Sequence, residues 1–200
     1  MRTLRQYGLL TLALILPLLP ALAAEPGIDH EKQYRACIAL TYRQPMRAFE
    51  TAENWARRDG GAPAHHCAAM ALLEAREYDR AARRLEALAA TLAADHVPSP
   101  GDILAQAANI WLLGGRAGSA LQAIELALQY DPDRAVYLID RGRIRAEQGD
   151  HAAALRDLDR ALALNPDDDD AAAFRASALR HLGRADEALA AIDQALILNP

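Results

Sequence analysis

Two cysteines, Cys37 and Cys67, are the side chains best suited to covalent chemistry, and they are the only cysteines in the 200-residue chain. Their wide separation differs from the closely spaced C-x-x-C pair of a redox centre. In an oxidising compartment such an even pair forms a disulfide. Closing a loop of this size stabilises a folded chain by roughly 3–4 kcal/mol in the chain-entropy model. We therefore predict a structural disulfide between Cys37 and Cys67.

Two clusters hold residue types that bind metal ions. His65, His66 and Cys67 are consecutive, but neighbouring residues of a helix point about 100° apart and cannot converge on one ion. The acidic run from Asp167 to Asp170 lacks the alternating pattern of a calcium loop. It suits the start of a helix, where carboxylates cap free N–H groups. We expect surface and turn histidines, an N-terminal cap, and no metal.

The other polar residues form no recognisable catalytic constellation. The sequence contains no nucleophile elbow, phosphate-binding loop, dinucleotide fingerprint or paired-carboxylate signature. Its carboxylates lie on faces that we expect to be solvated. The sequence therefore predicts a protein that is not an enzyme, with no catalytic residues and no cofactor.

The first 24 residues have the layout of a secretory signal peptide. A basic start precedes an uncharged apolar run at residues 8–22, and Ala-Leu-Ala at 21–23 is a cleavage pattern. A membrane anchor is the alternative, but the run is shorter than the ~20 residues of a spanning helix and contains two prolines. We expect residues 1–24 to be removed, the protein to be exported to the periplasm, and no membrane insertion afterwards.

The composition is acidic, rich in alanine and leucine, and poor in aromatic residues. The formal charge is −5, and it becomes −7 without residues 1–24, which hold two arginines and no acids. This balance argues against nucleic acid and anionic membranes as partners. Lysine occurs once, beside many arginines and alanines, which is typical of a GC-rich bacterial genome. Abundant alanine and leucine without an alternating strand pattern favour an all-α fold.

Prolines and glycines recur at a fixed interval in the second half of the chain. Pro132, Pro166 and Pro200 are equally spaced, and Pro98 keeps the same step. Glycines 115, 149 and 183 share the period, and glycine can adopt the left-handed conformation that ends a helix. The interval indicates stacked repeats. We divide residues 98–200 into units 101–134, 135–168 and 169–200, in which two helices flank a glycine turn and the proline ends the second.

Apolar residues also repeat in register within these units. Small ones let two antiparallel helices approach closely; they are Ala108, Gly142 and Ala176 on the first helix, and Ala120, Ala154, Ala188, Ala127, Ala161 and Ala195 on the second. Larger residues at spacings of three, four and seven make one apolar stripe on each second helix. The stripes are Leu121, Ile124 and Leu128; Leu155, Leu158 and Leu162; and Leu189, Ile192 and Leu196.

This pattern resembles the tetratricopeptide repeat (TPR). Gly142, Ala154, Ala161 and Pro166 stand at repeat positions 8, 20, 27 and 32, which form the signature of that family. The resemblance covers residues 98–200 and implies a right-handed superhelix of stacked antiparallel helix pairs. The chain lacks the Trp and Tyr that the family often has at positions 4 and 11, so the motif implies nothing specific about a partner.

Residues 25–97 follow the pattern more loosely. We expect one hairpin from helices at 29–43 and 45–58, and a second from a helix at 62–76 followed by a turn and helix at 75–89. Degenerate terminal repeats are common in such arrays, because an end repeat faces water on one side. Together with residues 98–200, this segment predicts five helical hairpins.

Two arginines at the same repeat position suggest ion pairs. Arg141 and Arg175 each precede an aspartate by the same number of positions, at Asp159 and Asp193. We predict ion pairs between these arginines and the aspartates of the second helices, within or between repeats. Such pairs contribute little to stability if they are exposed.

The resemblance places a binding groove on the first helix of each repeat, where family members commonly hold an extended peptide or helix. The groove positions in this chain include Asn109, Ile139, Arg143, Glu147, Arg180 and His181. Among them, Arg143 and Arg180 are the best candidates for contacts, because guanidinium groups pair with carboxylates in a fork and lose less by desolvation than lysines.

The sequence thus favours a periplasmic scaffold that binds a protein or peptide partner in the groove and carries out no catalysis. One alternative is the regulatory or targeting portion of a longer envelope enzyme or assembly factor, with the remainder beyond residue 200. Another is a stabilising subunit of an oligomer, since the sequence leaves the oligomeric state open.

Overall fold

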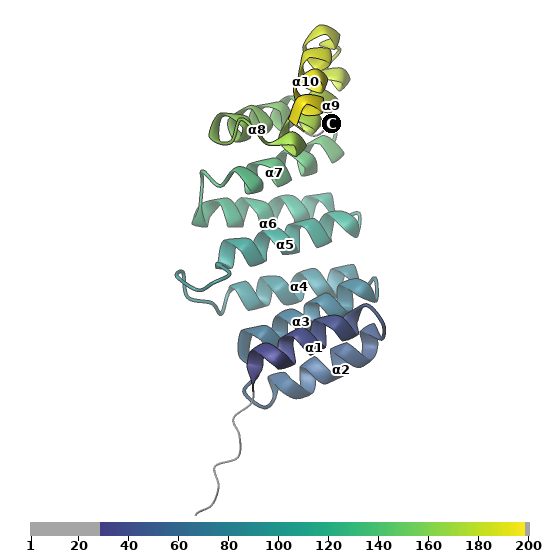
Figure 1. Cartoon of the computed structure of the whole chain (residues 1–200), viewed down its shortest axis with the longest axis vertical. Helices are drawn as coiled ribbons and strands as arrows, with labels where there is room; N and C mark the ends of the chain where they lie inside the picture. Colours follow the sequence, from purple (N-terminus) through teal and green to yellow (C-terminus); the bar gives the residue numbers. More distant parts are fainter. Residues whose placement is uncertain (1–28, 199–200) are drawn as a thin grey trace, which may run out of the picture.

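The computed structural model describes residues 29–198, and throughout this range the regular secondary structure is helical, in ten α-helices (Figure 1). The first helices of successive pairs are α1 (His30–Thr41), α3 (Gly61–Glu74), α5 (Pro100–Leu113), α7 (Ala135–Glu147) and α9 (Asp169–His181). The second helices are α2 (Pro45–Ala56), α4 (Tyr78–Ala89), α6 (Ala117–Tyr130), α8 (His151–Leu164) and α10 (Ala185–Leu198). The predicted all-α class is confirmed.

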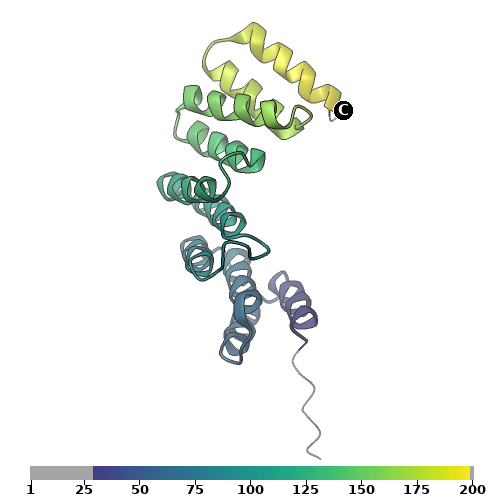
Figure 2. The same cartoon turned by 90° about the vertical axis from the view of Figure 1, so that its left-hand side faces the viewer.

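Consecutive helices fold into hairpins that stack along the long axis of the molecule (Figure 1). Most helices pack chiefly on their neighbours in sequence, but α1 packs on α3 as extensively as on α2, and α7 also contacts α5 and α9. The turned view in Figure 2 shows the later pairs rotated relative to the earlier ones, as in a superhelix. The first helices therefore line up on one side of each pair, and side chains from different repeats can meet there.

Glycines close the turns of the later hairpins in the left-handed conformation. The φ angles of Gly115, Gly149 and Gly183 are 71°, 81° and 73°. The hairpin of α3 and α4 makes the same turn at Arg76, with φ 60°. This turn was less visible in the sequence because a side chain that carries a Cβ adopts the conformation usually given to glycine.

The small residues lie where the helices of a pair cross. At Gly142 of α7, an added Cβ would lie 3.0 Å from Cγ of Leu158 and 3.4 Å from the carbonyl oxygen of Ala154, both on α8. The repeat residues Ala108, Ala176, Ala120, Ala154, Ala188, Ala127 and Ala161 are also buried. The predicted signal peptide, the side chain of Ala195, and Pro200 lie outside the described residues.

Two of the predicted proline stops are found at the ends of second helices. Helix α6 is followed by Asp131 and α8 by Asn165, both in extended backbone immediately before a proline. Asp168 then caps α9 by accepting a hydrogen bond from the Ala171 amide at 2.9 Å, which confirms the capping role expected for the acidic run. Pro98 differs, because α4 ends at Ala89 and residues 90–99 form a longer connection to α5.

The apolar stripe of the second helices is covered within the stack and exposed at its end. Ile124 and Leu158 are buried between neighbouring helices. On α10, the equivalent Ile192 is exposed, as are Leu189 and Leu196. A stripe of this kind loses contact with water only when the first helix of another pair lies against it.

The predicted ion pairs are found in part. Arg175 binds Asp159 of the preceding repeat at 2.6 Å, which is one of the pairs expected between repeats. Arg141 instead binds Asp157, through Nε and Nη2 at 3.0 and 2.7 Å, and Arg145 binds the same carboxylate at 2.7 Å. The reason is helix geometry: Asp157 lies on the face of α8 that is buried against α7, whereas Asp159 lies on an exposed face.

These two carboxylates make a matched pair for a stability test. The side chain of Asp157 is 6% exposed and that of Asp159 is 51% exposed. We expect Asp157→Asn to lower the free energy of unfolding by about 2–3 kcal/mol, because it leaves two guanidinium groups without their buried counter-charge. Asp159→Asn is expected to cost less than about 1 kcal/mol.

Urea denaturation followed by far-ultraviolet circular dichroism measures both values. Equal losses in the two variants would contradict the assignment of Asp157 as the buried link between α7 and α8.

Candidate functional site

A chain of hydrogen bonds links helices α1, α3 and α5. Tyr34 of α1 lies with its hydroxyl 2.9 Å from Nδ1 of His66 on α3, and Nε2 of the same imidazole lies 2.8 Å from Oε1 of Gln106 on α5. The amide oxygen of Gln106 can only accept, so Nε2 donates to it, and Nδ1 pairs with the tyrosine hydroxyl, which can donate or accept. Both ring nitrogens of His66 are therefore engaged in hydrogen bonds.

A second cluster continues along the next first helices. The Asn109 amide on α5 donates to the Asp140 carboxylate on α7 at 3.0 Å, and Arg143 donates to Asp140 at 3.2 Å and to Asn109 at 3.4 Å. The guanidinium carbon of Arg143 also lies 5.2 Å from the ring centre of Phe174 on α9, within the range of a cation–π contact.

The two clusters together form one line of side chains, to which all five first helices contribute. We call this line the polar ladder; it comprises Tyr34, His66, Gln106, Asn109, Asp140, Arg143 and Phe174. Gln106 and Asn109 are three positions apart on α5, so they lie about one helical turn from each other on the same face. The ladder runs across the stack rather than along any one helix.

The carboxyl of Asp140 lies buried in the middle of the ladder. Burial raises its pKa above the usual value for aspartate, whereas the Asn109 amide and the Arg143 guanidinium lower it. Arg143 is in turn 38% exposed. The Arg143 guanidinium is therefore partly exposed to solvent, and the carboxylate of Asp140 beneath it partly neutralises its charge.

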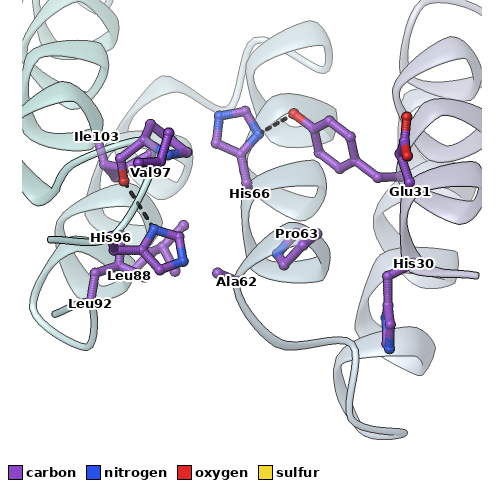
Figure 3. Close-up of a pocket in the computed structure, with 12 residues that line it drawn as sticks. His30, Glu31, Ala62, Pro63, His66, Leu88, Leu92, His96, Val97 and Ile103 are labelled. Atoms are coloured by element: carbon purple, nitrogen blue, oxygen red, sulfur yellow. Dashed lines mark hydrogen bonds between the residues drawn. The ribbon is translucent and has the colours of Figure 1, made fainter.

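A cavity of about 410 Å³ opens at the N-terminal end of the ladder (Figure 3). Tyr34 of α1 and His66 of α3 both line it, and the hydrogen bond between them lies in its wall. Leu88 of α4, Ile103 of α5, and Val97 of the 90–99 connection complete much of the wall. The cavity therefore needs α1, α3 and the long connection in their relative positions.

The disulfide fixes two of these elements together. Cys37 and Cys67, the pair expected from the sequence, are joined between α1 and α3. Tyr34 lies one turn before Cys37, and His66 immediately precedes Cys67. On α1, only Cys37 and Thr41 are buried. The bridge therefore supplies much of the attachment of α1, and with it the position of Tyr34.

A family model of the tetratricopeptide repeat matches residues 115–178. The glycine turns, the small crossing residues and the stacked helix pairs agree with this match. Residues 115–178 are therefore tetratricopeptide repeats, and residues 29–198 as a whole have a TPR-like superhelical fold. A search of the curated proteins by sequence finds no match.

Solved structures of other TPR proteins share the fold. MamA from Desulfovibrio magneticus RS-1, residues 41 to the end, is 17% identical with a TM-score of 0.68, covering 86% of this chain and 96% of that one. A kinesin light chain with nearly identical TPR-like repeats, from Podospora anserina, is 18% identical with a TM-score of 0.68, over 84% and 93% of the two chains.

A third solved structure, YrrB, is described as a TPR protein with an unusual peptide-binding site. It is 18% identical with a TM-score of 0.63, over 86% of this chain and 87% of that one. At such identities the likeness concerns the superhelical fold.

The residues proposed for the TPR groove do not all lie together. Asn109 and Arg143 belong to the polar ladder. Glu147 is the exposed last residue of α7, and Arg180 and His181 are exposed at the end of α9, where the His181 ring stacks on His151 at 4.3 Å. Ile139 is buried, with 7% of its surface exposed, and its role as a contact residue stays a prediction.

The sequence analysis missed Tyr34, His66, Gln106, Asp140 and Phe174. A signal for three of them was present, because Gln106, Asp140 and Phe174 occupy the same position of successive repeats. The assignment of His66 as a surface or turn histidine was wrong, since the residue is half-buried and bonded on both sides.

Two further properties concern only residues 29–198. Within that range, His, Cys, Asp and Glu side chains nowhere gather in a group of three that could hold a metal ion. None of its helices has both the length and the apolar character needed to cross a membrane.

Removing the disulfide is expected to loosen α1 selectively. In a Cys37→Ala, Cys67→Ala variant, the loss of roughly 3–4 kcal/mol of loop-closure stabilisation should raise amide hydrogen exchange in α1 by about 100-fold or more. Exchange in α7 and α8 should stay unchanged, because each repeat contacts mainly its neighbours. Unaltered exchange in α1 would show that packing alone holds this helix.

Removing the charge of Arg143 is expected to raise the pKa of Asp140 further, because that charge opposes the effect of burial. The folded state of Arg143→Gln should then hold the Asp140 proton to higher pH than the unfolded chain does. The contribution of this carboxyl to stability is accordingly present at low pH and lost as pH rises through the folded pKa.

A ¹³C NMR titration of the aspartate carboxyl carbons measures this shift. Arg180→Gln is the control and should leave the Asp140 titration unchanged, since Arg180 does not contribute to it. An unchanged Asp140 pKa in Arg143→Gln would contradict the electrostatic link within the ladder.

Proposed function

We propose that this TPR protein is a periplasmic scaffold without catalytic activity, and that it binds an extended segment of a protein partner along the polar ladder. The observation that carries the proposal is the ladder itself, in which each first helix places at least one side chain on a shared line. A line of regularly placed polar groups suits a partner that is itself linear, such as an extended backbone with its own repeating donors and acceptors.

The chemistry of the ladder supports a protein partner. Arg143 keeps part of its guanidinium exposed above Asp140 and Phe174, so it can donate to a carboxylate or a backbone carbonyl. Asp140 and Phe174 hold the guanidinium in place before binding, which reduces the entropy that an ordered contact would otherwise cost. A partner segment would thus meet donors that are already oriented.

Export is supported by two independent features. The N-terminal 24 residues have the order of a basic start, an apolar run and a small-residue cleavage pattern. The chain also forms its one disulfide from its two cysteines, and such bridges persist in oxidising compartments such as the periplasm.

The proposal is tested by site-specific crosslinking in intact cells of the native host. A photoreactive amino acid replaces exposed Ser177 on the first helix α9 in one variant, and exposed Ala152 on the second helix α8 in another. We expect both proteins in the periplasmic fraction without residues 1–24. A protein partner should be captured from position 177 and not from position 152.

Each part of the proposal has its own contrary result. Capture from position 152 alone, or equally from both, would place the interface away from the first helices. Recovery from the cytosol with the N-terminal segment intact would overturn the periplasmic location.

A further inference from the structure

The connection between α4 and α5 is longer than the other connections between repeats, and it forms part of the cavity wall. Residues 131–134 and 165–168 join the later pairs, whereas residues 90–99 join α4 to α5. Leu92, His96, Val97 and Pro98 of this longer segment all line the 410 Å³ cavity. A regular repeat would not supply these side chains, so the cavity is a particular feature of this chain.

The lining is mainly apolar and nearly free of formal charge. Leu88, Ile103 and Pro63 face the cavity from three different helices. Among residues 29–198, the lining contains no lysine, arginine or aspartate, and the one glutamate there, Glu31, forms an ion pair with Arg35. Both ring nitrogens of His66 are already engaged, by Tyr34 and Gln106. An entering charged group would lose hydration without gaining a counter-charge, so the cavity favours an uncharged apolar group.

The mouth of the cavity is open to solvent. Val97 is 89% exposed, and His30, Glu31 and Pro63 are exposed as well. Sites for free small molecules usually enclose most of the ligand surface. An open cavity is better suited to a side chain whose own backbone covers the entrance.

The place of the cavity also favours a side chain over a free molecule. The Tyr34–His66 hydrogen bond is both part of the cavity wall and the first step of the polar ladder. A segment that follows the ladder therefore passes the mouth. An apolar side chain of that segment can be buried in the cavity, while its backbone stays beside the polar groups of the ladder.

We propose that this cavity binds one large uncharged apolar side chain, such as Leu, Met or Phe, from an extended segment of a protein partner. The proposal rests on the proposed function, and it names the residue type by which the partner is selected. The 90–99 connection then acts as a specificity element, because it supplies the wall that the regular repeats lack.

The test is selection of random dodecapeptides displayed on phage against the protein purified from its native host. Selected peptides are synthesised with a fluorescent label, and their Kd values are measured for three proteins. These are the parent, Ala62→Trp, which fills the cavity, and Ala152→Trp, which adds the same side chain on exposed α8. Circular dichroism of each variant checks that it is folded.

We expect the selected peptides to share one large apolar residue. Losing the burial of that residue should weaken binding to Ala62→Trp by about 30-fold, with Ala152→Trp binding as the parent does. Val97→Asp provides a second variant at an exposed position that does not disturb the core. It places a carboxylate at the mouth and should weaken binding by about 10-fold.

The contrary outcomes separate the two proposals. Selected peptides without a shared apolar residue, or with equal affinity for all variants, would overturn the cavity as the anchor and leave the scaffold function standing. Failure of the parent to select any peptide would overturn binding of an extended segment, and with it both proposals.

Discussion

The close approach of two helices at small residues is the constraint on which the rest of the molecule depends. Gly142 faces Leu158 and the backbone of Ala154 at a distance that leaves no room for a larger side chain. Because the helices of a pair touch there, side chains on either side of the crossing meet at hydrogen-bonding distance. The double pairing of Arg141 and Arg145 with Asp157 is one result. The polar ladder is another, since it requires successive first helices to lie within reach of each other.

The N-terminal hairpin must also hold its helices close together, but it has fewer buried apolar contacts to do so. Helix α1 buries only two residues, so its apolar contacts contribute little compared with those of α5, which buries nine. A covalent bond replaces the missing packing at the position where α1 passes α3. Since Tyr34 lies beside this bond in sequence, the same bridge that holds the weakest helix also positions the start of the ladder.

Some groups of the ladder are fully bonded within the protein, whereas others remain free to bind a partner. Asp140 is buried and accepts from two donors, so its cost of desolvation is offset within the protein. Arg143 uses its Nη1 donor for Asp140 and Asn109, and part of its guanidinium remains exposed to solvent. A fully satisfied network would only stiffen the array, whereas one with an exposed donor can also bind. His66, with both ring nitrogens bonded, is satisfied within the protein, whereas Arg143 keeps a donor exposed.

The sequence by itself determined the features that depend on local structure. The repeat period, the left-handed glycines, the proline stops and the helix ranges of all five hairpins follow from residues within one turn or one repeat of each other. Even the degenerate hairpins were located to within a few residues, because helix-breaking residues and apolar spacing act locally. The cysteine pair was also evident, since only one pairing exists.

Only the tertiary structure decided which side chains meet. Arg141 pairs with Asp157 rather than Asp159 because the rotation of α8 turns one of two nearby carboxylates inward. Ile139 is buried, and Tyr34, His66 and Gln106 converge from three helices far apart in sequence. The path of residues 90–99, and the cavity it helps to enclose, likewise has no local signature. Such contacts depend on how each helix is rotated against its neighbours, and the packing of the whole stack sets that rotation.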